Sequence, residues 1–454
     1  MQYDVVIIGG GPAGVQAGIS CRNTYPDKTI LLIRKEKTAL IPCGIPYALT
    51  SLKSVDEDIL ADSLLARHRI ELAVGEVSGR EDKVLSLRDG RHIGFNRLVL
   101  ATGSVPIAPP IPGIDQQGVH VLSKAYEHLV KLREAIQAAQ RVIVVGGGFV
   151  GIELADELAR AGKTVTLIEQ QDEVLPGSID PEFARPVRQA LAGSGVDIIT
   201  GTALKAFVGK KTLSGADLDN GRWITADLAI VSVGFRPNLT LAAKLGLTID
   251  DSLGVLVNEY LRTSDPDIFA VGDCAAKHNC LTGELQRTML ASTAMAEGRL
   301  AGSNVFSINV VKGFAGTLGS LITQVGGLAV GVTGLTEREA HRLGVEYLVG
   351  RSEGMDRHPA TLPGATRMIV KLLFARYSRI LLGAQLCGGG SVGELTNLLS
   401  VMIQNKMTDA QMDTLQIGTH PLLTPSPLAY PVISATVDAI LRAVPDEARQ
   451  PAAP

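Results

Sequence analysis

Two glycine-rich segments hold the residues whose types and spacing best indicate chemistry. VVIIGGGPAG spans residues 5–14 and VIVVGGGFVG spans 142–151, and each runs from apolar residues through G-x-G-x-x-G into helical composition. Such glycines permit a tight turn, close approach to a pyrophosphate and close helix–strand packing, while the helix N-terminus faces the phosphates. One motif is a weak signal, but two in this context predict that the chain binds two dinucleotides. The motif glycines are Gly9, Gly11, Gly14, Gly146, Gly148 and Gly151.

A cysteine, Cys43 in IPCGIPY, lies between the two glycine segments in the chain. It opens a predicted helix, and a helix N-terminus lowers the pKa of a thiol. Thiol redox chemistry is therefore the leading hypothesis, against the plain alternative of a small buried hydrophobic residue. The other cysteines are scattered and predict neither a disulfide framework nor a metal site, so we interpret them as structural. They are Cys21, Cys274, Cys280 and Cys387.

The elements that must position these residues follow from hydrophobic patterning. A strand over 4–9, a helix over 12–24 and a strand over 29–33 form a first βαβ unit, and residues 141–169 form a second. The sequence also predicts a helix over 54–70, followed by further strands that end in glycine turns. Residues 320–440 alternate like antiparallel strands and then take helical spacing over 390–407. The glycine-ended strands lie in 96–106, 227–238 and 267–275.

Length and composition limit the class of protein. The chain has 454 residues, 46% of them hydrophobic, with 49 glycines and a net charge of −3. Two or three domains with ample apolar core are expected, and nothing indicates a nucleic acid or an anionic membrane as partner. Charged residues interrupt every long apolar run, so no membrane insertion is expected. Neither a signal peptide nor paired cysteines are expected, which favours a reducing cytoplasm.

The order of the motifs carries a family resemblance. GGGPAG, Cys43, ATGS, GGGFVGIE, VGFRPN and AVGDCA follow one another and precede the alternating region. This order resembles the flavin-dependent pyridine nucleotide–disulfide oxidoreductases over nearly the whole chain. Disulfide reductases of that family carry a second cysteine where this chain has Ala48. The chain therefore resembles the single-cysteine branch: coenzyme A disulfide reductase, NADH oxidase, NADH peroxidase and NAD-dependent persulfide or polysulfide reductases.

The resemblance implies an α/β fold with two Rossmann-like dinucleotide-binding domains, for FAD and NAD, plus a C-terminal α+β dimerisation domain. The FAD-binding domain would comprise residues 1–112 and 249–320, with the NAD-binding domain over 113–248. The interface domain would span 321–446, and a disordered tail 447–454.

The resemblance also implies which residues hold FAD. Asp273 would bond the ribityl hydroxyls, and the segment ending at Val77 would meet the adenine. An acid about 20 residues after the glycine turn usually bonds the ribose. Arg34 stands where the family has Glu, so either the nearest acid, Glu36, serves or the adenosine is held differently. The FAD set is Gly9, Gly11, Pro12, Ala13, Gly14, Glu36, Val77, Ala101, Thr102, Gly103 and Asp273.

For the second site, the resemblance places NADH on Gly146, Gly148 and Gly151, with Gly234 as a further cofactor contact. Glu169 ends the following strand, and a carboxylate there accepts a 2′-hydroxyl and repels a 2′-phosphate, which favours NADH over NADPH. Glu153 would lie near the nicotinamide, unless it is an ordinary surface glutamate of the helix.

Catalysis is expected from Cys43, whose thiolate lies over the flavin in the family. His420 in GTHPLLTP stands where relatives place a residue that reaches the partner subunit's active site, and it could protonate a leaving thiolate. The alternative is a turn histidine, and His358 is a similar case. Pro12 replaces the histidine of the peroxidases, and Arg22 lacks the basic neighbour that the coenzyme A enzymes carry, so peroxidase activity and specific coenzyme A binding are disfavoured.

The expected function is an FAD-dependent NADH oxidoreductase, a homodimer, that reduces a small disulfide, persulfide or polysulfide through its single redox-active cysteine. Two alternatives remain open. One is an NADH oxidase that uses oxygen and cycles its cysteine through a sulfenic acid. The other is an electron-transfer subunit that passes electrons between NADH and a protein partner, in which Cys43 would be dispensable.

Overall fold

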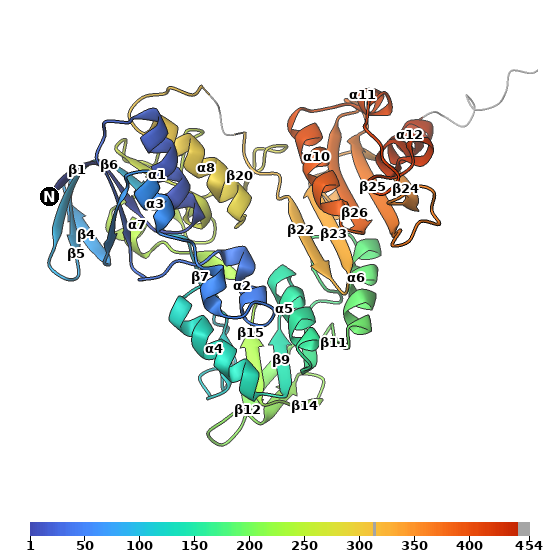
Figure 1. Ribbon diagram of the computed structural model, residues 1–454, viewed down its shortest axis with the longest axis horizontal. Coiled ribbons are helices and arrows are strands. Elements are labelled where there is room, and N and C mark those ends of the chain that lie inside the picture. The colour runs from blue at the N-terminus through green and yellow to red at the C-terminus, as the bar shows by residue number, and fades with distance from the viewer. Residues whose placement is uncertain (312–314, 444–454) are drawn as a thin grey trace, which may run out of the picture. The chain divides into compact units, whose positions relative to one another are not determined.

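A computed structural model describes residues 1–311 and 315–443 (Figure 1). The chain divides into two compact units. The first comprises Met1–Val142, Lys205–Asp217 and Trp223–Thr317, and the second comprises Ile143–Leu204, Leu218–Arg222 and the described residues from Leu318 onward. The tail predicted over 447–454 lies outside the described residues, and the predicted domain limits stay predictions.

The first unit is organised around a mainly parallel sheet with the strand order β3-β2-β1-β6-β5-β4, to which β19 adds along β6. The parallel part joins β1 to β2 and β6, β2 to β3, and β19 to β6, whereas β5 pairs antiparallel with both β4 and β6. The predicted first βαβ unit is therefore confirmed. The strands are β1 (Gln2–Ile8), β2 (Ile30–Arg34), β3 (Glu71–Val74), β4 (Val77–Glu81), β5 (Val84–Leu87), β6 (His92–Leu100) and β19 (Ile268–Ala270).

Helices pack on both faces of this sheet, and β1 is accordingly apolar on both sides. Val5 and Ile7 pack into the cluster with α1 (Pro12–Thr24) and α8 (Ala291–Asn304), while Val6 and Ile8 join the opposite cluster with α7 (Thr240–Lys244). A strand buried on both faces is typical of parallel sheets. Figure 1 shows α1 and α8 side by side, and glycines on α8 allow this approach: a Cβ on Gly302 would lie 2.2 Å from the Ala17 carbonyl oxygen.

The helix predicted over 54–70 is wrong as a single element. The structure has a short 3₁₀ helix, η2 (Val55–Asp58), and a separate α3 (Ser63–Arg67). Between them the backbone pairs with an earlier segment, because Leu60 N donates to Ala39 O at 2.9 Å. This long-range bond takes the backbone group that a continuous helix would use.

The remaining elements of the first unit are short. A second parallel pair is formed by β8 and β15, and β12, β13 and β14 form a small sheet. The elements are η1 (Pro42–Gly44), α2 (Ile45–Ala48), β7 (Ser104–Pro106), β8 (Val119–Val121), α4 (Tyr126–Ala138), β12 (Leu204–Val208), β13 (Gly215–Leu218), β14 (Trp223–Thr225), β15 (Leu228–Val231), β16 (Phe235–Pro237), β17 (Ile249–Asp250), β18 (Gly254–Val255), η3 (Gly272–Cys274), β20 (Lys277–His278) and β21 (Leu285–Gln286).

The second unit begins with the second predicted βαβ unit, which is also confirmed. It comprises β9 (Arg141–Val145), α5 (Phe149–Arg160) and β10 (Thr164–Ile168), followed by α6 (Pro181–Gly193) and β11 (Asp197–Ile199), which pairs parallel with β10.

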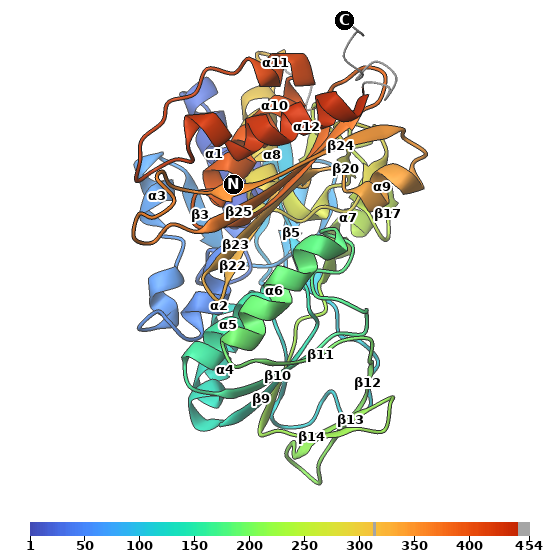
Figure 2. The ribbon, with the colours of Figure 1, turned by 90° about the vertical axis from the view of Figure 1, so that its right-hand side faces the viewer.

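The C-terminal part of the second unit is an antiparallel sheet with the order β22-β23-β26-β25-β24, as the alternating pattern predicted. Figure 2 shows α10 and α12 lying along this sheet. The elements are β22 (Leu321–Val325), β23 (Leu328–Gly334), α9 (Glu337–Arg342), β24 (Tyr347–Met355), β25 (Arg367–Ala375), β26 (Leu381–Gly388), α10 (Val392–Gln404), α11 (Asp409–Asp413), η4 (Pro427–Ala429) and α12 (Pro431–Ala443).

The two faces of this sheet pack against different helices, as the alternation of side chains along its strands shows. Thr333 on β23 bonds Ser400 on α10 at 2.9 Å, and its register partner on β26 is Ala384. Gln385, the next residue, must therefore face the other way. It accepts a hydrogen bond from Asp180 N, at the start of α6, at 2.7 Å. Helices α10 and α6 thus contact opposite faces.

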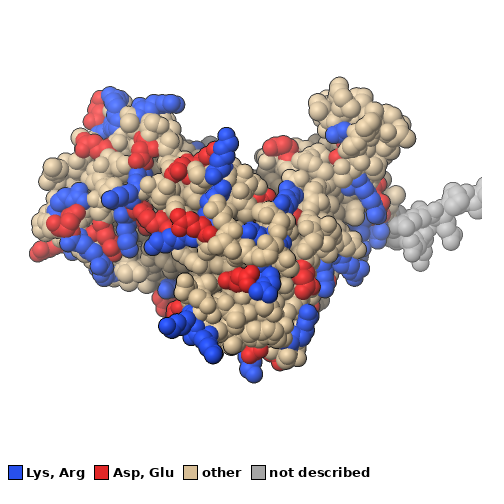
Figure 3. All heavy atoms as spheres, turned by 60° about the horizontal axis from the view of Figure 1, so that its bottom comes forward, with Lys and Arg blue, Asp and Glu red and all other residues tan. Residues whose placement is uncertain are grey.

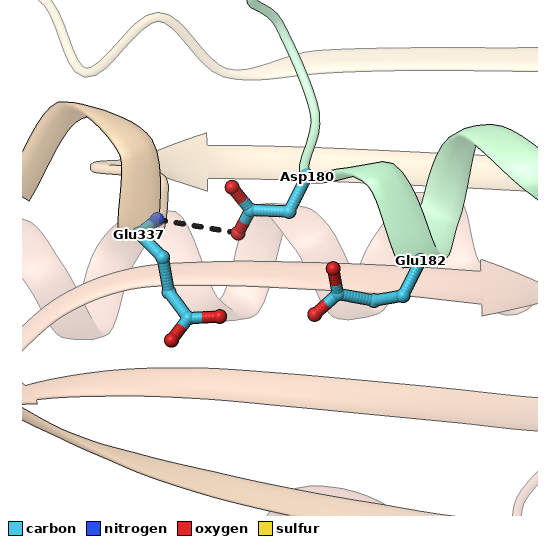
Figure 4. A group of neighbouring side chains, drawn as sticks. All are labelled: Asp180, Glu182 and Glu337. Atoms are coloured by element: carbon cyan, nitrogen blue, oxygen red, sulfur yellow. Dashed lines mark hydrogen bonds between the residues drawn. The ribbon is translucent and has the colours of Figure 1, made fainter. Parts of the chain in front are cut away.

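The face toward α6 carries a charged cluster, whose three carboxylates come from Asp180, Glu182 and Glu337 (Figure 4). Lys371, the register partner of Gln385, is almost fully buried among them. Its ammonium lies 2.6 Å from carboxylate oxygens of both Asp180 and Glu182 and also contacts Glu337. Burial alone would raise the pKa of Asp180, but Lys371 and Gln385 hold that pKa below its usual value. A lysine therefore supplies the positive charge that these acids require.

Positive and negative side chains are interspersed on the face shown in Figure 3, in keeping with the small net charge. Within residues 1–311 and 315–443, no helix is long and apolar enough to cross a membrane.

Replacing Lys371 by Met should lower the free energy of unfolding at pH 7 by about 3–5 kcal/mol, because it leaves the buried Asp180 carboxylate without its counter-charge. Urea denaturation followed by circular dichroism measures this loss. Arg351 bridges Glu182 and Glu337 but is half exposed, so Arg351→Met is a matched control that should cost at most about 1 kcal/mol. Equal losses in the two variants would contradict the role given to Lys371.

Candidate functional site

The first glycine turn brings three backbone segments into close contact. Gly9 has φ +120°, and its N–H donates to Ile33 O at 2.8 Å. A Cβ on Gly9 would lie 1.9 Å from Ala101 O, and one on Gly14 would lie 2.0 Å from Gly9 O. Gly11, by contrast, faces open space and begins α1 without a side-chain cap. The turn therefore presents unbonded N–H groups of a helix N-terminus, with room for a pyrophosphate.

The second glycine turn repeats this construction. Gly146 has φ +107°, and its N–H donates to Ile168 O at 2.8 Å. Gly148 faces open space and begins α5, again without a side-chain cap. Both turns fit the phosphates of a dinucleotide. Because the first glycine of each turn donates to the last residue but one or the last residue of the neighbouring strand in the same way, the two βαβ units can be aligned, and Ile33 then corresponds to Ile168.

Glu169 follows Ile168 and is buried against its own glycine turn. Its Oε2 accepts a hydrogen bond from Gly147 N at 2.7 Å, and its Oε1 accepts one from Gln171 N at 2.8 Å. Each carboxylate oxygen can accept a second bond. The carboxylate is therefore fixed where the sequence predicted a ribose acceptor.

In the first unit the corresponding residue is Arg34, which is buried and donates from its Nε to Glu36 O at 3.0 Å. Glu36, the predicted ribose acceptor, is itself exposed. Val77 opens β4, and its neighbour Glu76 forms ion pairs with Lys35 at 3.6 Å and Arg88 at 3.1 Å.

Asp273 lies on η3, next to the ATGS segment. Its Oδ2 accepts hydrogen bonds from the Ser104 hydroxyl at 2.7 Å and from Lys124 Nζ at 2.9 Å. Thr102 donates its hydroxyl to Asn238 O at 3.0 Å. The structure therefore brings together the motifs of Ala101, Thr102, Gly103 and Asp273. It adds Lys124, which no local pattern could have identified.

A buried ion pair fixes the backbone that carries Asp273. Glu297 Oε2 accepts a bond from Gly272 N at 2.7 Å, and Lys277 Nζ donates to Gly272 O at 2.6 Å. The two charged groups lie 3.0 Å apart. Sequence reasoning missed this pair, because a glutamate within a helix and a lysine on a two-residue strand give no signal of burial.

Cys43 is exposed on η1, which leads into α2. The predicted helix start is confirmed only as these two short turns. The segment is held from behind, because Ile41 N donates to Asp58 O at 3.0 Å. Arg133 on α4 then donates to Ala48 O at 2.5 Å and to Leu52 O at 2.6 Å. Arg133 was also missed, since its partners are distant in sequence.

The other cysteines have a different environment. Cys21, Cys274 and Cys387 are buried and Cys280 is half-buried. Burial raises the pKa of Cys21 to about 12 and the pKa values of Cys280 and Cys387 to about 11. These groups are therefore protonated at neutral pH and are poor nucleophiles, which agrees with a structural role.

Asp58 is buried directly beneath the Cys43 segment. A Cβ on Gly44 would lie 1.9 Å from Asp58 Oδ1, so only glycine fits beside the carboxyl group. Asp58 Oδ2 has no hydrogen-bond partner among the described residues. Burial raises the pKa of Asp58 to about 6. Sequence analysis did not single out this residue, because two other acids directly precede it in SVDEDI.

Glu153 on α5 is half-buried and accepts a hydrogen bond from the Thr323 hydroxyl at 2.7 Å. Burial raises the pKa of Glu153, against the lowering effect of Thr323. Gly151 is a buried residue of the same helix, and Gly234, in the first unit, adopts φ +104°.

His420 is exposed in a loop of the second unit. Its Nδ1 accepts a hydrogen bond from Leu422 N at 3.3 Å, so the neutral ring carries its proton on Nε2. His358 supports the same loop, since its N–H donates to Pro421 O at 3.1 Å. The loop also exposes Leu423, which is 71% accessible, and η4, which follows it, exposes Leu428, which is 97% accessible.

In the comparisons with known proteins, one family model matches the part of the chain that holds the glycine motifs, and a second matches the C-terminal part. The family described as pyridine nucleotide-disulphide oxidoreductase matches residues 3–298. The dimerisation domain of that family matches residues 322–428.

Individual relatives span nearly the whole chain. An NADH oxidase of Methanocaldococcus jannaschii is 31% identical over 92% of this chain and 94% of its own length. An NAD(P)H coenzyme A polysulfide/persulfide reductase of Pyrococcus horikoshii is 29% identical over 86% of this chain and 88% of its own. The structure of an NAD-dependent persulfide reductase from A. fulgidus matches with a TM-score of 0.90 at 31% identity, covering 97% of this chain and 83% of that one.

The raised pKa of Asp58 predicts a pH-dependent stability. The unfolded chain ionises Asp58 near its ordinary pKa of about 4, but the folded chain does so only near pH 6. Ionisation therefore destabilises the fold as the pH rises through this window, and the penalty persists above it. Asp58→Asn should raise the melting temperature at pH 8, and the gain should narrow at pH 5.

Thermal denaturation at the two pH values checks this expectation. Glu57→Gln removes an exposed neighbouring carboxylate and should show no such pH-dependent gain. A loss of stability in Asp58→Asn at pH 8 would contradict the burial argument.

Proposed function

Since the chain belongs to the pyridine nucleotide-disulphide oxidoreductase family, we propose that this FAD-dependent NAD(H) oxidoreductase reduces a small disulfide, persulfide or polysulfide through Cys43. The observation that carries the proposal is the exposure of Cys43 on a segment clamped by Arg133, while Cys21, Cys274 and Cys387 are buried. A redox thiol must reach its substrate, and buried thiols do not.

We assign FAD to the first glycine turn with Asp273, and NADH to the second with Glu169. The FAD-binding domain is then 1–112 with 249–320, and the NAD-binding domain is 113–248. Bound FAD supplies the two-electron transfer between nicotinamide and sulfur. The protein's contribution is to hold the phosphates on α1 and α5 and to fix the acceptors around them.

The sulfur step belongs to Cys43. Its thiolate attacks one sulfur of the acceptor, forming a mixed disulfide or persulfide and releasing the other sulfur as a thiolate. Overall, one NADH and one proton reduce one disulfide to two thiols. His420 of the partner subunit, in its protonated imidazolium form, is the proposed proton donor to the leaving thiolate.

Coenzyme A is not favoured as a specific handle for the acceptor. Arg22, the basic residue of the first helix, donates to Pro26 O and Lys28 O at 2.7 Å each, and to Arg69 O at 2.7 Å. Its Nε donates to a fourth carbonyl, that of His68, at 3.1 Å. A guanidinium engaged in this way serves the fold rather than a phosphate.

A homodimer in a reducing cytoplasm completes the proposal. The matched dimerisation domain and the exposed leucines of the His420 loop favour a second copy of this chain as the partner. The single exposed cysteine, without a disulfide framework around it, suits a compartment that keeps thiols reduced.

An NADH oxidase is the second candidate, favoured by the relative from Methanocaldococcus jannaschii. Oxygen would then be the acceptor, and Cys43 would cycle through a sulfenic acid. NADH consumption measured separately with oxygen and with polysulfide, under otherwise equal conditions, distinguishes the two activities.

Cys43→Ser should retain FAD and its reduction by NADH, yet lose at least about 100-fold in turnover with sulfur acceptors, because the covalent intermediate cannot form. Stopped-flow absorbance and steady-state NADH consumption measure the two steps. Cys280→Ser, which changes a half-buried thiol, is the matched control and should stay active. Full sulfur-reductase activity in Cys43→Ser would instead favour the electron-transfer alternative.

Glu169→Gln should raise the ratio of kcat/KM for NADPH to that for NADH by roughly tenfold, equivalent to about 1.4 kcal/mol. The amide can still accept from Gly147 N, but it no longer repels a 2′-phosphate. Glu173→Gln removes a nearby carboxylate and should leave the ratio unchanged. A native enzyme that already prefers NADPH would contradict the assignment.

Mixing Cys43→Ser with His420→Ala under conditions of subunit exchange should restore part of the activity, because one site of each mixed dimer has both residues intact. Recovery of sulfur reduction after exchange is the measurement. Confirmed mixed dimers that stay inactive, or a fully active His420→Ala enzyme, would contradict the shared site.

A further inference from the structure

The two dinucleotide turns differ at one equivalent position. Gly9 N donates to Ile33 O, as Gly146 N donates to Ile168 O, so Arg34 occupies in the first unit the place of Glu169 in the second. A carboxylate at this strand end usually takes the adenosine ribose. The first site therefore lacks the usual acceptor at the usual position.

Arg34 lies against its glycine turn, as Glu169 does. A Cβ on Gly10 would lie 2.7 Å from Arg34 Cδ, just as a Cβ on Gly147 would lie 3.0 Å from Glu169 Cβ. The Arg34 side chain is only 4% exposed. The aliphatic stem of Arg34 thus lies against its turn as the stem of Glu169 does, and the guanidinium lies beyond that stem.

The guanidinium holds a carboxylate at the end of this stem. Arg34 Nη1 donates to Asp62 Oδ1 at 2.5 Å, and Nη2 donates to Asp62 Oδ2 at 2.8 Å. Nη2 also donates to Lys37 O at 2.5 Å. The bidentate pair fixes the orientation of Asp62, which supplies the counter-charge that the buried Arg34 requires.

Asp62 has the free acceptor capacity that Arg34 lacks. A guanidinium only donates, whereas a carboxylate offers about four lone-pair sites, of which the bidentate pair uses two. The Asp62 side chain is 51% exposed. Although Asp62 precedes α3, its carboxylate does not cap that helix. Within residues 1–311 and 315–443, no group other than Arg34 bonds this carboxylate, so about two of its acceptor sites remain open.

We propose that Asp62, positioned by Arg34, accepts the hydroxyls of the adenosine ribose of FAD, in place of a strand-end carboxylate. The proposal rests on the assignment of FAD to the first turn. Glu36 is the competing acceptor, but Arg34 bonds only its backbone carbonyl, whereas it holds both carboxylate oxygens of Asp62. The ribose-binding carboxylate has thus moved from the strand end to the start of α3.

The test compares FAD with its analogue that carries 2′-deoxyadenosine, binding each to the flavin-free protein and following the quenching of flavin fluorescence. The native protein should bind FAD about 10-fold or more tightly than the analogue, since a hydrogen bond to a charged acceptor is lost. Asp62→Ala should bring the ratio close to one. Arg34→Glu combined with Asp62→Ala should restore it, because a carboxylate then stands at the strand end.

Asp62→Ala leaves the buried Arg34 without its counter-charge, which could prevent folding, so a second variant is needed. Arg34→Met combined with Asp62→Ala removes both charges and should also lose the preference. The proposal is overturned if Asp62→Ala or Arg34→Met with Asp62→Ala keeps the native ratio of affinities for FAD and its analogue, or if Glu36→Gln loses that ratio. It is also overturned if the native protein binds FAD and the analogue equally well. If Glu169→Gln loses the preference instead, the assignment of FAD to the first turn has failed, and the proposal fails with it.

Discussion

The close backbone packing at the first glycine turn is the constraint on which the first unit depends. Gly9, Gly14 and Ala101 approach so closely that no side chain fits between the strand ends and α1. The contact lies at the edge of the sheet where the parallel strands β1, β2 and β6 end. Because parallel strands share their carboxyl edge, the loops that leave them converge there. Asp273, Thr102 and the start of α1 meet for this reason.

Buried charges stabilise the positions of these loops. Lys277 with Glu297 fixes the backbone before Asp273, Arg34 orients Asp62, and Lys371 holds the start of α6 against the C-terminal sheet. In each case a cation with little solvent access is bonded to a carboxylate. Such pairs contribute little net stability compared with apolar packing, but breaking one is costly. Their value in this protein is that they specify where particular loops lie.

The Cys43 segment is held by hydrogen bonds to its backbone rather than by a buried ion pair. Its helical turns are too short to be stable alone, and they depend on Arg133 and on the backbone bond to Asp58. An exposed thiol on a segment held from behind can meet a substrate without displacing the core. The unpaired, buried Asp58 carboxyl is the cost of packing this segment closely, since Gly44 leaves no space for another group.

The sequence by itself determined the two strand–turn–helix units, the antiparallel character of the C-terminal region and the family. These features depend on local order, namely on apolar runs, glycine spacing and strand alternation. The tertiary structure decided what local order cannot encode. The expected helix over 54–70 is interrupted because Leu60 bonds Ala39, and the partners of Arg34, Lys124 and Lys371 lie far away along the chain. A charged residue looks the same in sequence whether it is solvated or buried, and only the packing of distant segments selects its partner.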